Sequence, residues 1–496
     1  KTPVIDSLRQ DGVTFQNAFC TSPLCAPSRA SYLTGRYSFI TGNGECSHDG
    51  QEGHIRDTDI MWGEYLKSEG YHMRHVGKSH VGTHKMIDLF TENDSPWDRW
   101  SPPWYDDDQY LAYLADLGLA PFEFADPLYG DAADGSKKGN FYGGYLAPQN
   151  GKPFPKEGTY PAYLVHKAIQ ALKTQNNDKP VFLQLDFFGP HQPFAIPGGM
   201  EERAKELRES ITLPDSFCSL LENDFADPPG EPRIYRLYRK NWGLTDAEMV
   251  REYQVANILQ FELIDELLGE LISYLKETSM YDDTWVYFIA DHGEMNCEMG
   301  IVDKGTYLNP RVMRVPLIVK PPVSSHTLWQ PGLKIGGNVS LLDIAPTILF
   351  EAGIEIPERL DGLRLHGALA GEERPEEFCL MCEIWNHVMP NLAVGTVFKS
   401  KFGGYRFFSY NMTDDRDELY EINNAALCNL LSEMTHIHDY ANDISNPILE
   451  AHREAVCVLQ KRLARDPRWE AYDRYIKLEY AKILDIHADN QLFIIE

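Results

Sequence analysis

The 496-residue sequence has little positive charge, no visible framework of paired cysteines and no long apolar run. With 46 Lys and Arg against 74 Asp and Glu, its formal net charge is −28, which argues against nucleic acid and against an anionic membrane as partners. Its nine cysteines are scattered, and no apolar run is long enough to span a bilayer. An anionic small substrate is still compatible with this surface. Charges more than about 8 Å apart in solvent are largely screened, so a local cationic pocket outweighs them.

The most informative stretch is Cys-Ala-Pro-Ser-Arg at 25–29, followed by Leu-Thr-Gly-Arg at 33–36. It places a thiol, a hydroxyl and an arginine close together, just before a segment with the pattern of a helix. Pro27 fixes its own backbone and restricts the preceding residue, so we expect Cys25 to be held rigidly. Arg29 would add its charge to the positive end of the helix dipole and create a compact site for an anion.

The residues alone leave several roles open for Cys25. It could be an ordinary buried cysteine or half of a disulfide. It could also be a thiolate nucleophile of a phosphatase, although the arginine of those enzymes follows the cysteine at a longer spacing than Arg29 does here. The length and specificity of the motif favour a further role, in which the cysteine is modified.

Other reactive side chains follow segments that we predict to be strands. The segments 70–76, 180–188 and 284–290 are predicted strands, and the last two are apolar enough to be buried on both faces of a parallel sheet. In open α/β sheets, ligands bind beyond the carboxyl ends of the strands, so we expect the side chains that follow to converge on one pocket with Cys25. These side chains are Lys78, His80, His191, Asp291 and His292, with Lys304 in the loop beyond the last strand.

Together, these motifs resemble the type I sulfatase family of the alkaline phosphatase superfamily. The resemblance rests on 25–36, on Gly-Lys-x-His at 77–80, on Pro-His-x-Pro-Phe at 190–194, and on Asp-His-Gly-Glu at 291–294 with Lys304 downstream. Ser79 stands where the family commonly has tryptophan or methionine. The resemblance implies that a maturation enzyme oxidises Cys25 to formylglycine, an aldehyde whose hydrate is the nucleophile.

The resemblance also implies the roles of the other residues. Asp291 and His292, with the hydrate at Cys25, would bind Ca²⁺ or Mg²⁺. The metal and Arg29 would stabilise charge on the sulfuryl oxygens, and Lys78 and Lys304 would bind sulfate oxygens. The remaining acid and base roles fall to three side chains. Either Lys304 or His191 would protonate the leaving alcohol, and His80 would take a proton from the remaining hydroxyl to expel sulfate.

The predicted fold is an alkaline-phosphatase-like α/β sandwich with a mixed, mainly parallel sheet over residues 1–370. A smaller C-terminal α+β subdomain follows over 371–496, because short alternating segments at 405–410 and 418–422 predict an antiparallel sheet. A helix from about 447 to 463 is expected to pack on it. Regular patterning fades between about 84 and 160.

One part of the family pattern is missing from the sequence. Family members normally begin with a hydrophobic strand that ends in two further acidic or amide metal ligands, whereas Lys1 already resembles the approach to the first helix. We therefore expect the native protein to extend upstream of Lys1. In this chain we expect a half-filled metal site, and an unpaired edge or slot in the sheet.

The resulting hypothesis is an enzyme that hydrolyses sulfate monoesters, with a sulfated carbohydrate or an aryl or alkyl sulfate as substrate. One alternative is a phosphonate or phosphate monoester hydrolase of the same superfamily. Another is a non-catalytic relative that binds anions or glycans. Resemblance to the family favours a periplasmic or secreted location, while the sequence leaves the oligomeric state open.

Overall fold

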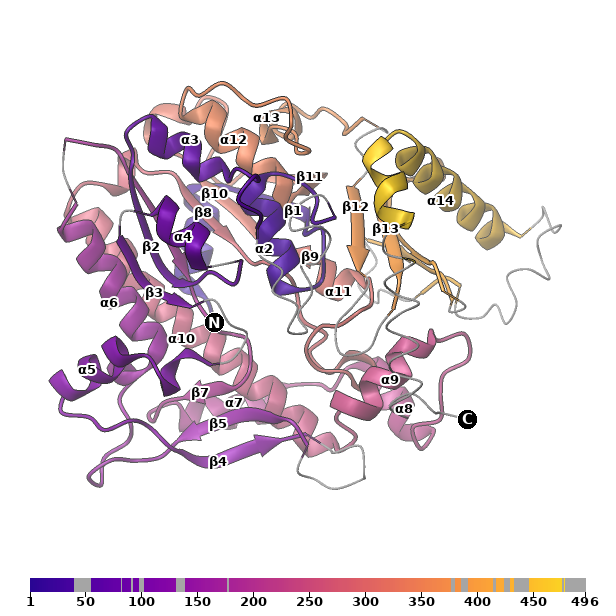
Figure 1. Cartoon of the computed structure of the whole chain (residues 1–496). Helices are drawn as coiled ribbons and strands as arrows, with labels where there is room; N and C mark the ends of the chain where they lie inside the picture. Colours follow the sequence, from indigo (N-terminus) through magenta and orange to yellow (C-terminus); the bar gives the residue numbers. More distant parts are fainter. Residues whose placement is uncertain are drawn as a thin grey trace.

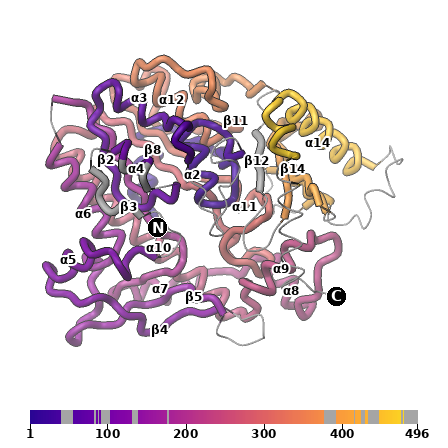
Figure 2. Tube along the Cα trace, in the orientation of Figure 1, coloured from indigo at the N-terminus to yellow at the C-terminus, as the bar shows by residue number. Residues whose placement is uncertain are grey.

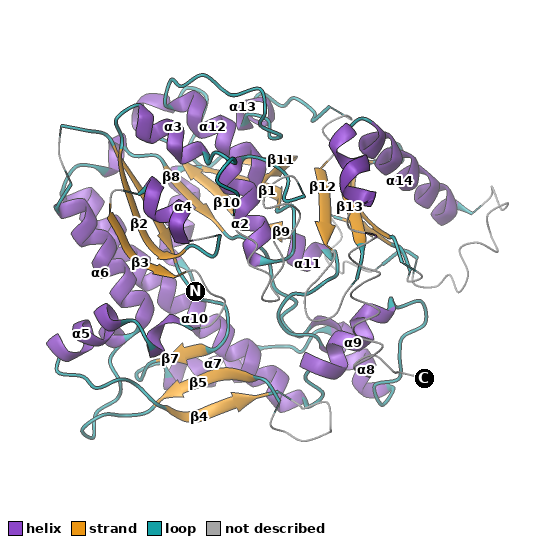
Figure 3. Cartoon of the chain, in the orientation of Figure 1, coloured by secondary structure: helices purple, strands orange, loops and turns teal. Residues whose placement is uncertain are grey.

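A computed structural model of the chain describes residues 1–39, 55–81, 83–90, 92–97, 102–130, 139–175, 178–375, 380–384, 391–413, 416–422, 429–431, 446–474 and 477. Figure 1 shows a large α/β body, with a smaller sheet and the long helix α14 (Pro447–Ala464) at one side. Strands lie between layers of helices in the large body (Figure 3). Within the described residues, no helix combines the length and apolarity needed to cross a membrane.

The largest sheet contains both parallel and antiparallel strands. Its order is β11 (Lys334–Ser340), β1 (Val13–Phe19), β10 (Leu317–Lys320) and β8 (Val286–Ile289), and the short β9 (Arg314–Val315) also pairs with β1. β1 runs parallel to β11 and antiparallel to β9 and β10. A second sheet joins β2 (His72–Lys78) in parallel to β3 (Glu92–Trp97) and β6 (Val181–Asp186). The mixed sheet expected from the sequence is confirmed.

Helices cover both faces of these strands. One apolar cluster joins the sheets to α1 (Pro3–Asp11), α6 (Tyr160–Lys173) and α10 (Ala247–Glu277). The opposite cluster joins them to α2 (Cys25–Thr34), α3 (Trp62–Ser68), α4 (Thr83–Leu89), α12 (Ile344–Glu351) and α13 (Leu365–Leu369). Successive residues of β10 alternate between the clusters, since Leu317 and Val319 enter one and Ile318 the other. The sheet is therefore packed on both sides.

β6 and β8 differ from the expectation that both strands are fully buried. All their residues are only half-buried, because among the described residues β6 pairs with β2 alone and β8 with β10 alone. The two strands lie in one layer. Leu183 and Phe288 pack against the cluster that contains α10, whereas Phe182 and Tyr287 pack against the opposite cluster. Among the described residues, β6 and β8 are therefore each an edge strand with apolar side chains, and the predicted slot stays a prediction.

The region from 84 to 160 is more regular than its sequence indicated. It contains α5 (Asp108–Asp116) and the antiparallel pair β4 (Phe124–Tyr129) and β5 (Phe141–Leu146), which β7 (Phe194–Ile196) extends in parallel. The sequence did not indicate β5 because it contains Gly143 and Gly144, and glycine has a low propensity for strands. They are needed there, because a Cβ on Gly143 would lie 2.1 Å from the backbone of Phe194.

The remaining helices and the small sheet complete the fold. α7 (Glu201–Ser210), α8 (Asp215–Glu222) and α9 (Arg233–Trp242) precede α10, and α11 (Pro310–Met313) precedes β9. The small sheet is antiparallel in the order β12 (Leu380–Ile384), β13 (Ala393–Lys399), β14 (Tyr405–Asn411) and β15 (Glu418–Glu421). α14 packs against it through a shared apolar cluster, and the side chain of Asn446 caps that helix. This confirms the predicted C-terminal sheet and helix.

Small-sheet residues also reach the loop that carries Lys304. The side chain of Asn391 donates a hydrogen bond to the carbonyl oxygen of Thr306 at 2.6 Å. The side-chain amide of Asn309 lies 3.2 Å from the hydroxyl of Tyr420 in β15. Figure 2 shows the two regions of the chain next to each other. The small sheet thus supports a loop of the large body.

Candidate active site

Cys25 is the first residue of α2 and has almost no exposed surface. β1 ends at Phe19, and a short turn brings the chain to Leu24, whose carbonyl oxygen accepts the first hydrogen bond of the helix from Ser28. Pro27 is tolerated in this first turn, where a backbone N–H has no helical partner. Gly35, in the left-handed conformation at φ 66°, ends the helix. The sequence correctly predicted a helix here, but the helix begins at Cys25, within the motif, and not just after it with Arg29 at its start.

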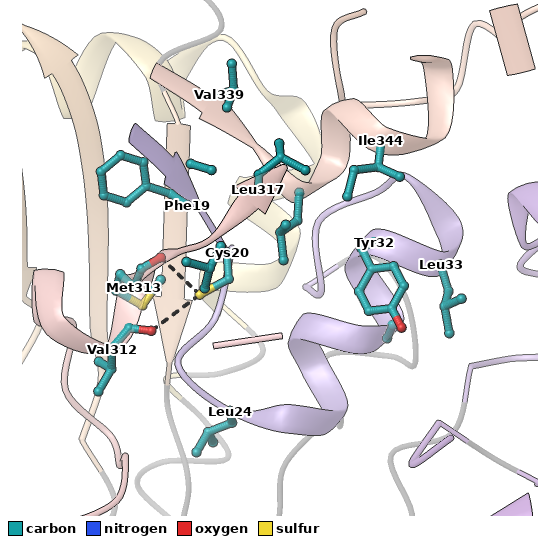
Figure 4. Packing of buried hydrophobic residues seen from close by; sticks show 14 of the residues in the cluster. Phe19, Cys20, Leu24, Tyr32, Leu33, Val312, Met313, Leu317, Val339 and Ile344 are labelled. Carbon is teal, nitrogen blue, oxygen red and sulfur yellow. Dashed lines mark hydrogen bonds between the residues drawn. The ribbon is translucent and has the colours of Figure 1, made fainter. Parts of the chain in front are cut away.

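Two nearby cysteines have different surroundings. Cys20 belongs to an apolar cluster, and its Sγ lies 3.3 Å from the carbonyl oxygen of Met313 (Figure 4). Cys25 is in none of the apolar clusters. Its Sγ lies 3.1 Å from Nε2 of His292 and 3.6 Å from Nζ of Lys78. Cys25 is thus buried among polar and cationic groups, which is not the environment of a core cysteine.

Arg29 is buried beneath this thiol and pairs with two carboxylates. Its Nε donates to Asp291 at 2.8 Å, and its Nη1 lies 3.4 Å from Asp186 and donates to the carbonyl oxygen of Lys78 at 2.8 Å. Burial lowers the pKa of Arg29, but Asp291 and Asp186 raise it by more than burial lowers it. The net pKa is above its usual range, so the guanidinium stays charged. These contacts hold the end of β2 and orient Asp291, and the direct contact of Arg29 with an anion stays a prediction.

Asp291 and His292 follow β8 and form a candidate metal site with Cys25. Their ligand atoms all lie within 4.8 Å of one another, and this is the one such cluster among the described residues. Burial raises the pKa of Asp291, but His292 and Arg29 lower it well below its usual range. Burial lowers the pKa of His292, but Asp291 and Cys25 raise it to about 8. An ionised carboxylate and an imidazole suit a divalent cation, whereas a thiol is a soft ligand that suits Ca²⁺ or Mg²⁺ poorly. An oxygen at residue 25 would fit better.

Lys304 and His191 form the next pair, with Nζ and Nε2 only 2.6 Å apart. Lys304 also contacts Asp303 at 2.8 Å. Burial lowers the pKa of Lys304, but Asp303 and Cys25 raise it well above its usual range. Burial and the charge of Lys304 lower the pKa of His191. The proton between them therefore stays on Lys304, which donates a hydrogen bond to Nε2 of neutral His191. The Nδ1–H of His191 donates to the carbonyl oxygen of Gln192.

Lys78 and His80 complete the group around Cys25. Burial lowers the pKa of Lys78, although Cys25 opposes this effect. Burial also lowers the pKa of His80, against a hydrogen bond from Cys25, so the imidazole is neutral and can accept a proton. His80 has φ 56°, a strained conformation for a residue other than glycine that recurs at functional sites. The structure brings together all the predicted site residues.

A second group of side chains, which sequence reasoning missed, supports Arg29. Asp186 is the last residue of β6, and its Oδ2 lies 3.0 Å from Nε2 of His75 and accepts from Gln184 at 2.6 Å. Burial raises the pKa of Asp186, but Arg29 and His75 lower it. A carboxylate at the carboxyl end of an apolar strand is the signal that could have identified Asp186. His75 lies inside β2 and gives no comparable signal.

Residues 1–354 match the family model described as Sulfatase. The chain belongs to the sulfatase family. It is 24% identical over 362 residues to the uncharacterized sulfatase YidJ of Escherichia coli, covering 73% of this chain and 65% of that protein. The match to an N-acetylglucosamine-6-O-sulfatase of Bacteroides thetaiotaomicron is 24% over 429 residues, covering 75% of this chain and 67% of that enzyme.

The chain also resembles solved hydrolase structures in its fold. The phosphonate monoester hydrolase of Agrobacterium radiobacter superimposes with a TM-score of 0.68 at 18% identity, covering 93% of this sulfatase and 91% of that chain. At this identity the likeness concerns the fold alone. This likeness confirms the expected α/β architecture, and the family match over 1–354 supports the expected class of enzyme.

Proposed function

We propose that this sulfatase hydrolyses sulfate monoesters at the group of side chains around Cys25. The observation that carries the proposal is the position of the Cys25 thiol, at a helix start between His292 and Lys78. This buried thiol lies outside the apolar clusters and contacts polar side chains instead. As formylglycine, residue 25 would supply a hydrated aldehyde as nucleophile. A divalent cation held by Asp291, His292 and residue 25 would supply Lewis-acid stabilisation of the sulfate charge.

The side chains of the chain have distinct tasks in this proposal. The ammonium groups of Lys78 and Lys304 bind sulfate oxygens from two sides of residue 25. Arg29 keeps Asp291 ionised and in place. Lys304 is the candidate acid for the leaving alcohol because, against the effect of burial, Asp303 and Cys25 keep its ammonium group protonated, whereas His191 is neutral and only accepts a hydrogen bond from it. His80, neutral and beside Cys25, accepts the proton released when sulfate leaves.

We propose a sulfated carbohydrate as the substrate class, supported by the name of the N-acetylglucosamine-6-O-sulfatase relative. We also propose the division into a catalytic part, 1–370, and a C-terminal subdomain, 371–496. Among the described residues β6 and β8 each lack a partner on one side, which supports the hypothesis that a further apolar strand completes the sheet.

The experiment is kinetic and chemical at once. The chain is co-expressed with a formylglycine-generating enzyme, the peptide containing Cys25 is weighed by mass spectrometry, and turnover is measured on sulfated monosaccharides and an aryl sulfate. We expect activity to follow the fraction of formylglycine. Activity that is independent of this fraction would overturn the nucleophile assignment.

A phosphonate monoester hydrolase is the second candidate, favoured by the structural likeness to the Agrobacterium radiobacter enzyme. Matched aryl sulfate and aryl phosphonate monoesters, assayed with the same leaving group, separate the two activities. A higher kcat/KM on the phosphonate would reverse our assignment.

A further inference from the structure

The long helix α10 contacts both of the chain segments that carry the Lys304–His191 pair. His191 lies in the loop between β6 and β7, and Lys304 lies in the segment between β8 and α11. Two side chains of α10, Tyr253 and Gln260, reach these segments, and both are almost fully buried. Positions 253 and 260 are about two helical turns apart, so the two side chains share one face of α10 at a separation of about 10 Å along its axis.

Gln260 contacts the His191 loop at both of its ends. Its Oε1 accepts a hydrogen bond from the backbone N–H of Ala195 at 3.0 Å, just after the loop. The beginning of the loop packs on the same side chain, because a Cβ on Gly189 would lie 3.3 Å from Cγ of Gln260. A buried backbone N–H needs a partner, so loss of the Gln260 oxygen would loosen this loop.

Tyr253 connects the His191 loop to the segment that leads to Lys304. Its ring packs edge-on against the ring of Phe194, with 5.1 Å between the centroids. Phe194 is the first residue of β7 and follows the His191 loop directly. The hydroxyl of Tyr253 donates to Oε1 of Glu294 at 3.2 Å. One side chain of α10 therefore touches both segments.

Glu294 extends this support to Lys304. The same Oε1 accepts hydrogen bonds from the backbone N–H of Asn296, at 3.1 Å, and from that of Asp303. The backbone N–H of Met295 donates to the carbonyl oxygen of Asp303 at 3.0 Å. Asp303 has φ 69°, which is uncommon for a residue other than glycine, and its carboxylate lies 2.8 Å from Nζ of Lys304. Glu294 thus fixes the residue that forms the ion pair with Lys304.

We propose that Tyr253 and Gln260 of α10 are positioning residues. They hold the loop of His191 and the segment of Lys304 against each other, and Glu294 links Tyr253 to the second of these. A catalytic group must be held within about 0.5 Å of its productive position, which a buried helix can ensure for both members of a pair. The assignment of this task to catalysis rests on the proposed sulfatase function, in which Lys304 protonates the leaving alcohol.

The kinetic test uses the full chain with formylglycine at position 25 and aryl sulfates whose phenols differ in pKa. Tyr253→Phe keeps the ring and Gln260→Met keeps the length of the side chain, so each change removes little more than one hydrogen bond. Each variant should lower kcat about fivefold for the most basic leaving group, with KM little changed, and less for acidic phenols. Tyr274→Phe, about 30 Å further along α10, is the matched control and should behave as the wild type.

The double variant separates a shared task from two independent ones. If both side chains hold one contact, either change loosens it, so the double variant should lose clearly less than the product of the two single effects. Losses that multiply would show two independent structural effects and would overturn the inference. Thermal melting of each variant confirms that it folds.

Amide hydrogen exchange supplies a readout that needs no turnover. Mass spectrometry should show exchange about fivefold faster in the peptide containing Ala195 for Gln260→Met, and in the peptide containing Asp303 for Tyr253→Phe. Unchanged exchange in both peptides overturns the inference. Faster exchange with unchanged kcat, or with an equal loss for all phenols, also overturns it, because the side chains then serve stability and not the acid. If no form hydrolyses sulfate esters, the proposed function fails, and the exchange rates alone decide whether α10 holds the two segments together.

Discussion

Nζ of Lys304 lies 2.6 Å from Nε2 of His191, although the two residues are 113 positions apart in the chain. The two candidate acids of the sequence analysis are thus one hydrogen-bonded unit. Its proton lies on Lys304, because Asp303 raises the pKa of the lysine and the lysine in turn lowers that of the histidine. We therefore expect one acid, with His191 as its positioning residue.

Lys304→Ala should slow hydrolysis most for esters with basic leaving groups. Loss of a general acid typically costs 10²–10⁴-fold, and less where the leaving alcohol needs no proton. The measurement is kcat/KM for a series of aryl sulfates whose phenols differ in pKa. His191→Asn, which can still accept a hydrogen bond, should retain much of the wild-type dependence. An equal loss across the series would assign Lys304 to sulfate binding alone.

Cys25→Ala should abolish turnover and leave the fold intact. The thiol lies outside the apolar clusters, so its removal should shift the melting temperature by only a few degrees. Cys20→Ala is the matched control five positions earlier. It removes a core side chain, so it should lower stability by about 1 kcal/mol or more and leave turnover largely unchanged. The opposite pattern would make Cys25 an ordinary core cysteine.

His292 should titrate near pH 8 in the metal-free protein, because Asp291 and Cys25 raise its pKa to about 8 against the effect of burial. Below that pH the imidazole is protonated and cannot bind a metal ion. The apparent affinity for Ca²⁺ should therefore rise with pH up to about 8 and then level off. NMR of the imidazole and calorimetry in buffers of different ionisation enthalpy measure both effects. A histidine that titrates below pH 7 would contradict the assigned environment.

Tyr238→Phe should disturb the Lys304 loop without touching the substrate. The Tyr238 hydroxyl accepts a hydrogen bond from the backbone N–H of Thr306 at 2.9 Å. The Tyr238 ring packs so closely on Gly305 that a Cβ on this glycine would lie 2.3 Å from Cζ of the ring. Removing the hydroxyl leaves a buried N–H unpaired, which costs about 1–3 kcal/mol. We expect kcat to fall several-fold with KM little changed. If KM rises and kcat holds, Tyr238 acts on substrate binding instead.

Adding an apolar strand upstream of Lys1, ending in two acidic or amide residues, should strengthen metal binding. Asp291, His292 and residue 25 supply three donors, whereas Ca²⁺ takes six to eight oxygen ligands. The strand should also protect β6 and β8 from hydrogen exchange. Metal content after dialysis and amide exchange compare the two chains. Tight, stoichiometric Ca²⁺ in the shorter chain would show that the remaining ligands lie within these 496 residues.

Much of the site could be predicted, because its residues follow strands whose ends meet at one edge of the sheet. Lys78 and Asp291 were found this way. Asp186 obeys the same rule, but it lies inside the apolar run 180–188, which continues past it. The Arg29 pairing with Asp186 and Asp291 depends on the distance between β6 and β8, and no local pattern contains it. The strand β5 could not be predicted, because Gly143 and Gly144 lower its strand propensity. These glycines let the backbones of the partner strands come close, and the sequence of β5 alone does not show those partners.

The hydrogen bond from Asn391 to Thr306 has a practical consequence for truncation. The family match ends at residue 354, yet the loop carrying Lys304 is supported by residues beyond it, since Asn391 and Tyr420 both contact it. Ala393 and Phe407 also belong to the core of the large body. A fragment cut at the edge of the family match would expose that core and lose part of the support of the loop that carries Lys304. The part of the chain needed for a stable fold is therefore longer than residues 1–354, the part that matches the family model.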